Sequence, residues 1–265
     1  MADIKFVLFM AHIDQIFMVI LGLSVGSFLN TIISRLPHAI KNNQPSYTIF
    51  YPIRSHCMFC KKTLTILELI PVFSWLYIHG RCKKCNKPIP LRYLLVEIIT
   101  PILFIVFYDQ FHLSALTPIW MIFLSISIIL ACIDFEHYLL PDVLTLSLLS
   151  LGIVFSTMHL VPTPVEMSIL GALVAFVFLY IVNLFYKLFF KLDGIGRGDM
   201  KYFSAIGAWL GLENLPYVLW VASFSAIICI ALLSISQSKK IQSKHKIPFG
   251  IFLSVASMYS LFSIY

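Results

Sequence analysis

A polar, glycine-rich stretch from Gly194 to Lys201 lies between two long apolar segments and contains one carboxylate, Asp199. Its glycines let the backbone adopt left-handed conformations and approach another chain closely, as binding of an extended peptide would require. A flexible turn between two helices is the alternative for this stretch alone. A second carboxylate, Asp134, lies at the end of another apolar run. Two aspartates beside apolar sequence, where an unpartnered carboxylate is costly, indicate an acid and base pair.

The chemistry expected of this pair is that of an aspartic protease. Two carboxyl groups held close together do not both ionise readily, so they share one proton. The protonated group then polarises a peptide carbonyl while the carboxylate activates water. Helix polarity favours Asp134 as the acid, at the end of one helix, and Asp199 as the base, at the start of another. The assignment belongs to the coupled pair and can invert when substrate binds.

Other titratable side chains at the same boundary have simpler expected roles. Asp142 follows Pro141 at an N-cap position, and Asp193 is expected to be a solvated charge. His137 lies three residues after Asp134, where it is either solvated or able to modulate the pair.

The elements that hold these residues are expected to be transmembrane helices. The chain has 265 residues, of which 60% are apolar and 12% charged, against about 25% charged in an ordinary globular domain. Apolar runs long enough to cross a bilayer recur along it, so a soluble core is excluded. The net charge of +7 is interpreted as a topology signal and not as a nucleic-acid-binding surface. The predicted class is an all-α polytopic membrane protein of about eight transmembrane helices. The predicted spans are 16–33, 93–108, 115–133, 143–160, 167–186, 200–212, 216–235 and 248–264.

The basic residues orient these spans. Of the 19 Lys and Arg residues, ten fall between Arg35 and Arg92, four between Lys187 and Lys201, and four between Lys239 and Lys246. Since basic loops stay in the cytoplasm, these segments are expected there, with both termini on the periplasmic side. The span 200–212 is short for a full crossing, which suggests a thinned bilayer or a protein-lined environment.

Two cysteine pairs mark a different kind of segment between the first two spans. Cys57 and Cys60 are separated by 21 residues from Cys82 and Cys85. This is the spacing of a tetrahedral site with four thiolate ligands, so a structural Zn²⁺ is predicted, with surface disulfides or unpaired thiols as the alternative. The basic residues around the cysteines offset the thiolate charge and are able to meet anionic membrane lipid. His56 is a weaker candidate ligand.

The predicted division of the chain has three parts. Residues 1–33 form the first transmembrane helix, 34–92 a small cytoplasmic zinc-binding domain, and 93–265 a seven-helix peptidase domain. The remaining cysteines, Cys132 and Cys229, lie in apolar spans and are expected to be packing residues.

These motifs resemble those of the type IV prepilin peptidases, bifunctional leader peptidases and N-methyltransferases of the bacterial inner membrane. The resemblance covers almost the whole chain. The matching segments are Gly26 to Asn30, Arg35 to Pro37, both cysteine pairs, Ile70 to Leu76, Gly80 to Cys82, Arg92-Tyr93, Val96-Glu97, Ile133-Asp134, Leu139 to Thr145, Gly196 to Asp199 and Pro248 to Gly250.

The resemblance implies cleavage of the short basic leader of prepilins and pseudopilins at the cytoplasmic face, with Asp134 and Asp199 as catalytic aspartates. It also implies N-methylation of the new N-terminus from S-adenosylmethionine. For the donor site, Glu97 is the first acidic candidate, with helix capping or pairing as the alternative. Two other classes remain open: a presenilin-like intramembrane protease and a non-catalytic carrier with proton-relay aspartates.

Overall fold

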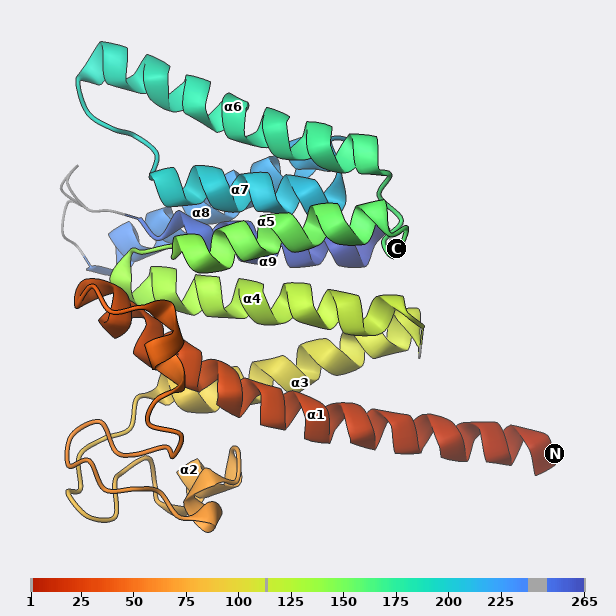
Figure 1. The fold of residues 1–265 in the computed structure, drawn as a ribbon, viewed down its shortest axis with the longest axis vertical. Helices are drawn as coiled ribbons and strands as arrows, with labels where there is room; N and C mark the ends of the chain where they lie inside the picture. The colour runs from red at the N-terminus through yellow and green to blue at the C-terminus, as the bar shows by residue number, and fades with distance from the viewer. Residues whose placement is uncertain (1, 113, 238–246, 265) are drawn as a thin grey trace. The chain divides into compact units, whose positions relative to one another are not determined.

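The computed structural model describes residues 2–112, 114–237 and 247–264. These residues form nine α-helices and two short 3-10 helices (Figure 1). The elements in order are α1 (Ala2–Lys41), η1 (Ser46–Phe50), η2 (Ile66–Leu69), α2 (Phe73–Tyr77), α3 (Leu91–Phe111), α4 (Leu116–His137), α5 (Asp142–Thr157), α6 (Val165–Phe190), α7 (Arg197–Leu210), α8 (Leu215–Gln237) and α9 (Phe249–Ile264).

Each of the eight predicted spans overlaps one helix, α1 or one of α3 to α9, so the prediction of an all-α membrane protein is confirmed. Five helices are long and apolar enough to cross a membrane: α1, α3, α4, α6 and α8. Helices α5 and α9 are apolar but shorter, and the count of eight crossings stays a prediction. The first helix was predicted to end near residue 33 but continues to Lys41, because Leu36 and Ala39 are still buried there. The predicted basic loop containing Lys239 to Lys246 lies outside the described residues, apart from its flanks.

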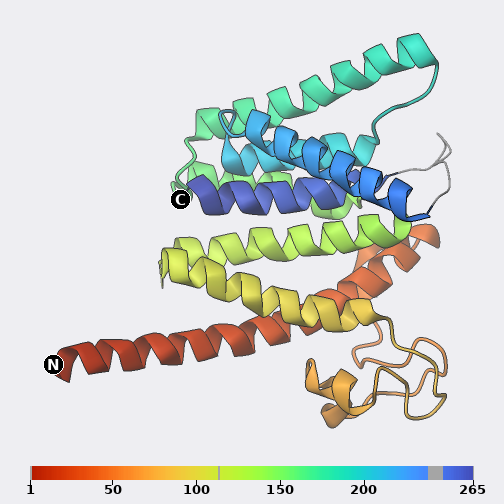
Figure 2. The same ribbon diagram turned by 180° about the vertical axis from the view of Figure 1, so that it is seen from behind.

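The chain divides into two compact units, Met1–Ser125 and Ile126–Tyr265, with the division inside α4. In the first unit, α1 packs against α3 (Figures 1 and 2). A Cβ atom added at Gly26 would lie 3.1 Å from the Cα atom of Glu97, so a larger residue here would have to push the two helices apart by a few tenths of an ångström. Further along the pair, the Asn30 amide donates to the Tyr93 carbonyl over 2.9 Å.

The segment that carries the cysteine pairs consists of short elements and turns. The two pairs adopt the same local structure, each closed by an isolated β-bridge, His56 with Thr63 and Arg81 with Pro88. A residue with positive φ follows each pair, Lys61 at 57° and Asn86 at 55°. The sequence repeat C-x-x-C thus becomes a structural repeat of two cysteine knuckles.

In the second unit, α6 and α5 pack against α7 (Figure 1). Residues Tyr202 to Leu210 of α7 are all buried. Helices α6 and α7 touch through their backbones, since a Cβ atom at Gly207 would lie 2.5 Å from the carbonyl oxygen of Gly171. Ser204 donates across this contact to the Ala172 carbonyl over 2.8 Å. Burial by neighbouring helices explains how a 14-residue helix with three charged residues near its start is stable here, in line with the protein-lined environment expected for it.

Candidate active site and metal centre

Asp134 is a buried side chain near the end of α4, with 5% of its surface exposed. Its Oδ2 atom accepts a hydrogen bond of 2.7 Å from the backbone N–H of Gly250, in the first turn of α9. The N–H of Ile251 also bonds to this carboxyl group. A Cβ atom at residue 250 would lie 2.9 Å from the same Oδ2 atom, so the glycine allows the helix to reach the carboxyl group.

Asp199 is the third residue of α7, after the N-cap residue Gly196. Its carboxyl group turns back and accepts a hydrogen bond from the N–H of Gly196. A Cβ atom at Gly196 would lie 2.8 Å from Asp199 Oδ2, so a side chain at this position would displace the Asp199 carboxyl group. The glycine-rich stretch therefore does more than turn the chain, because it begins α7 and fixes the carboxyl group against the helix N-terminus.

Leu140 shows that these two sites converge. Its side chain is buried in the short connection between α4 and α5. Its Cβ lies 2.9 Å from a Cβ position at Gly198, and its Cδ2 lies 3.1 Å from one at Gly250. The starts of α7 and α9 therefore meet around one leucine, and the charges of Asp134 and Asp199 act on each other. The structure brings together the two carboxylates that the sequence singled out.

Helix polarity does not distinguish the two aspartates, contrary to the sequence argument. Asp134 lies near the C-terminus of its own helix, but it bonds to the N-terminal N–H groups of α9. Asp199 lies at the N-terminus of α7. Both carboxyl groups therefore face the positive end of a helix, and the preference for Asp134 as the acid loses its basis.

Asn183 is a site residue that the sequence argument missed. Its Oδ1 atom, on α6, accepts hydrogen bonds from the N–H groups of Gly194 and Ile195 over 2.8 and 3.0 Å. One side chain thus holds the loop that leads into α7. A lone asparagine in an apolar helix was the available signal, since a polar side chain there needs a partner.

Asp142 does not cap α5 as predicted. Pro141 occupies the N-cap position, and Asp142 is the first helical residue. Both carboxylate oxygens of Asp142 instead accept hydrogen bonds from Lys201 Nζ over 2.7 Å. Because Pro141 occupies the cap position, the Asp142 side chain is not engaged in capping and bonds to Lys201 on α7. The other polar neighbours form exposed pairs, Lys187 with Asp193 at 3.0 Å and His137 with Glu136 at 3.9 Å.

The four predicted zinc ligands form one cluster, in which their sulfur atoms all lie within 4.8 Å of one another. The Cys57 and Cys85 sulfurs are 3.8 Å apart, and those of Cys60 and Cys82 are 3.9 Å apart. A tetrahedron with Zn–S bonds of about 2.3 Å has edges of about 3.8 Å. These separations are too long for disulfide bonds, and the donor set fits a four-thiolate metal site. His56 is not part of the cluster among the described residues.

The protonation of these thiols is uneven. Backbone N–H groups of Cys85 and Lys84 donate to the Cys82 sulfur and lower the pKa of this thiol to about 6. A hydrogen bond from the Lys87 backbone favours the thiolate of Cys85 as well, but burial and the neighbouring thiols raise its pKa to about 11. Because thiolates are the metal-binding form, complete ionisation of the cluster requires a cation to offset their repulsion.

Glu97 has the pairing role that was the alternative to donor binding. It is buried in α3, with 8% of its surface exposed. Its Oε2 atom accepts a hydrogen bond of 2.7 Å from the N–H of Val72, and Ser27 on α1 bonds to the same carboxyl group. Val72 has a φ of 63°, a strained value for a β-branched residue. Glu97 therefore fixes the chain just before α2.

Two family profiles match the chain. Residues 20–111 match the bacterial peptidase A24 N-terminal domain, and residues 121–231 match the type IV leader peptidase family. The chain belongs to the type IV leader peptidase family. The aspartate Asp134 and the start of α7 both lie in the second matched region, and all four cysteines lie in the first.

Curated members of the leader peptidase family match over most of this chain. Prepilin leader peptidase/N-methyltransferases from Aeromonas hydrophila and Legionella pneumophila are each 34% identical over 91% of it, covering 87% and 88% of their own lengths. One from Neisseria gonorrhoeae is 31% identical over 83% of the chain and 82% of its own length. No solved structure matches significantly. These matches favour the leader peptidases over the presenilin-like and carrier alternatives, and with the apolar helices they support a multi-pass inner-membrane protein.

The close fit at Gly250 gives a test of this geometry. Gly250→Ala is expected to lower leader cleavage strongly, because the new methyl group would displace the Asp134 carboxyl group. A misplacement of about 1 Å in a catalytic group costs roughly 100-fold in rate. The measurement is the rate of leader cleavage by purified enzyme in detergent.

A matched control for Gly250→Ala is Gly152→Ala. Its Cβ would lie 2.7 Å from Trp209 Cδ1, an equally tight contact that involves neither aspartate. This variant is expected to lose thermal stability while its folded fraction retains the cleavage rate. Equal rates for Gly250→Ala and the parent would contradict the placement of α9 against Asp134.

Proposed function

We propose that this protein cleaves the leader peptide from type IV prepilins and pseudopilins at the cytoplasmic membrane face, with Asp134 and Asp199 as the catalytic pair. The observation that supports it most directly is that the starts of α7 and α9 meet around Leu140, with Asp199 on the first and Asp134 bonded to the second, so that the two carboxyl groups interact electrostatically. The names of the related proteins supply the substrate class.

In this proposal the two carboxyl groups share one proton. The protonated group donates a hydrogen bond to the scissile carbonyl oxygen, while the carboxylate removes a proton from the attacking water. The tetrahedral intermediate then breaks the C–N bond as a proton passes to the leaving amine. The N–H of Gly250 holds one carboxyl group and the N–H of Gly196 the other. These fixed donors orient the pair without movement during the reaction.

The cysteine cluster is proposed to hold one structural Zn²⁺ through Cys57, Cys60, Cys82 and Cys85. Bound there, the metal would link the two knuckles in a segment with few buried residues. The four thiolates fill a tetrahedral shell, so the ion would have no open position for catalysis.

N-methylation of the new N-terminus is proposed as a second activity, with S-adenosylmethionine as the methyl donor implied by the relatives' names. Glu97 does not fit a donor-binding role. Its carboxyl group is buried and already bonded to Val72 and Ser27, so it presents no free acid to the donor. No methylation step is therefore assigned to a residue of this chain.

The proposal is tested by mass spectrometry of a prepilin co-expressed with this protein. The expected product has lost its leader and gained one methyl group at the new N-terminus. An intact leader, with the enzyme folded in the membrane, would refute the proposed peptidase activity. A cleaved but unmethylated product would refute the methyltransferase activity alone.

The proposed topology has both termini in the periplasm and the active site at the cytoplasmic face. Reporter fusions after Lys61 and Asp193 are expected to report cytoplasm, and fusions after Ser114 and Thr163 periplasm. The physical reason is the concentration of Lys and Arg in alternate loops. A fusion after Lys244 is also expected in the cytoplasm, although this position lies outside the described residues. A cytoplasmic signal at Thr163 would contradict the alternation.

A further inference from the structure

The segment Ile66–Tyr77, which precedes the second cysteine knuckle, exposes large apolar side chains outside the transmembrane helices. It contains η2 and α2. Ile66 is 85% exposed, Phe73 68% and Tyr77 75%. Such a surface is costly in water and indicates a partner or a lipid phase.

The packing of α1 against α3 shows how deep this segment lies. Successive contacts pair Gly26 with Glu97 and Asn30 with Tyr93. Matched positions on the two helices therefore give the depth of a residue along the membrane normal. Val72 bonds to Glu97. Glu97 is six residues into α3, about 9 Å from its first residue. Figures 1 and 2 likewise show that, along the axis of α3, α2 lies beside the first turns of that helix and does not extend past its N-terminus.

The stretch around Ile49 and Pro52, in the same cysteine-bearing segment, lies nearer the cytoplasm. Arg35 Nη1 donates to the carbonyl oxygens of Ile49 and Pro52 over 2.8 and 2.9 Å. Arg35 is nine residues after Gly26 on α1, which corresponds to about 13 Å along the helix axis. Tyr51, between these two carbonyls, is 69% exposed. It matches Phe73 in exposure but lies nearer the cytoplasm.

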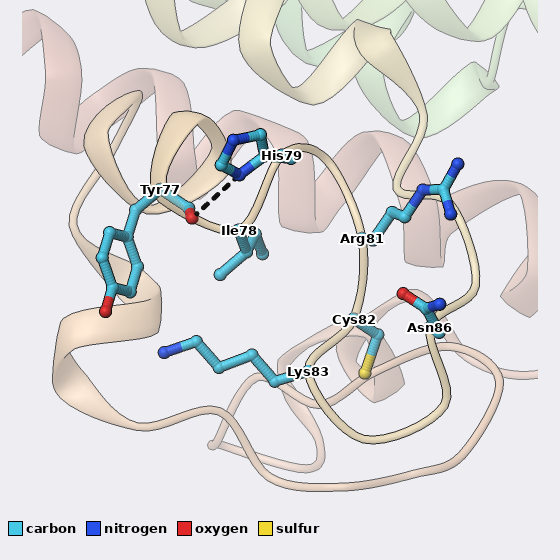
Figure 3. A pocket seen from close by; sticks show the side chains of 7 residues that line it. All are labelled: Tyr77, Ile78, His79, Arg81, Cys82, Lys83 and Asn86. Atoms are coloured by element: carbon cyan, nitrogen blue, oxygen red, sulfur yellow. Dashed lines mark hydrogen bonds between the residues drawn. The ribbon is translucent and has the colours of Figure 1, made fainter.

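Positively charged side chains lie beside the apolar segment. An open pocket of about 550 Å³ has a lining that includes Tyr77, Arg81 and Lys83, whose side chains are drawn in Figure 3. Lys83 Nζ lies 4.7 Å from the centre of the Tyr77 ring. An aromatic ring beneath a lysine is typical of the boundary between acyl chains and phosphate headgroups, and Arg81 adds a second positive charge to the pocket lining.

We infer that Ile66–Tyr77 inserts into the cytoplasmic leaflet as an interfacial anchor, with Phe73 and Leu76 among the acyl chains and an anionic phospholipid headgroup in the pocket of Arg81 and Lys83. Three observations agree on this occupant: the depth set by Glu97, the exposure of large apolar side chains, and the positive charges beside Tyr77. Helix α3 also exposes apolar side chains just beyond Glu97, with Ile98 37% and Ile102 52% exposed. The anchor would hold the cysteine knuckles against the membrane surface.

The test is photo-cross-linking in the full-length protein, reconstituted in vesicles of phosphatidylethanolamine and phosphatidylglycerol. The photoreactive amino acid p-benzoylphenylalanine replaces Phe73 in one variant, Leu76 in a second and Tyr51 in the matched control. After irradiation, mass spectrometry of the peptides measures the yield of lipid adducts. Phe73 and Leu76 are expected to give several-fold more lipid adduct than Tyr51. If labelling of Phe73 disturbs folding, shown by loss of bound metal, the Leu76 variant decides.

The proposed headgroup site is tested by a second measurement in the same experiment. In the Phe73-labelled protein, the share of phosphatidylglycerol among the lipid adducts is expected to exceed its mole fraction in the vesicles. The double substitution Arg81→Gln with Lys83→Gln should lower that share to the mole fraction. Equal adduct yields at Phe73 and Tyr51 would overturn the anchor. So would a cross-link from Phe73 to co-reconstituted prepilin in place of lipid, since the surface would then bind protein. Phosphatidylglycerol at its mole fraction in the unsubstituted protein would overturn the headgroup site.

Discussion

Asp134→Asn and Asp199→Asn are each expected to abolish leader cleavage. An amide neither takes a proton from water nor supplies one to the carbonyl oxygen, and loss of general acid or base catalysis costs about 10²- to 10⁴-fold. The amide retains most of the shape of the carboxyl group, so the hydrogen bonds from Gly250 and Gly196 still have an acceptor available. The measurement is single-turnover cleavage of a prepilin by purified enzyme.

The two effects should not add. Residues that act as one unit lose their function together, so the double variant should be about as inactive as either single variant. Two independent carboxylates would instead give effects that multiply. Near-parental cleavage by folded Asp199→Asn would refute the shared-proton mechanism.

Asp142→Asn is the matched control for these substitutions. Asp142 is also an aspartate at the start of a helix, and its partner Lys201 follows Asp199 by two residues. Its side chain is 60% exposed, so the loss of its ion pair is worth about 1 kcal/mol or less. Cleavage is therefore expected to change little. A loss as large as that of Asp134→Asn would assign the Lys201 pair to the catalytic machinery.

Removal of two cysteines is expected to release the metal and unfold the segment that carries both knuckles. The parent protein, purified without chelator, should contain about one Zn²⁺ per chain, and Cys57→Ser with Cys60→Ser should contain almost none. Structural zinc sites supply about 10–16 kcal/mol of apparent binding free energy, which a segment with so little buried surface cannot replace. Metal analysis and limited proteolysis between residues 54 and 89 measure the two effects.

Cys229→Ser controls for the loss of a thiol as such. Cys229 lies in α8 and is not a member of the cluster, and this variant should keep its zinc and its resistance to proteolysis. Methylation should suffer more than cleavage in the double variant, because the aspartates lie in a different compact unit from the cysteines. A parent protein without zinc, or a double variant that retains it, would contradict the assignment.

The sequence by itself determined the class of the protein, the approximate positions of its helices and the candidate residues for its chemistry. These features are local. Apolar runs mark the helices, C-x-x-C spacing marks each knuckle, and carboxylates beside apolar sequence are conspicuous because they are costly there. The length of α1 was less predictable, because its last turns lie beyond the continuous apolar run and are stabilised by the burial of Leu36 and Ala39.

Only the tertiary structure decided how the candidate site is held. The bond from Gly250 to Asp134 joins residues 116 positions apart, and no local pattern encodes such a pairing. That bond also removed the argument from helix polarity, because a second helix supplies the N–H groups that the first lacks. The ion pair between Asp142 and Lys201 likewise displaced a helix cap that the local sequence favoured. Hydrogen bonds and close backbone contacts between distant segments depend on the packing of whole helices, whereas helix formation and ligand spacing follow from neighbours along the chain.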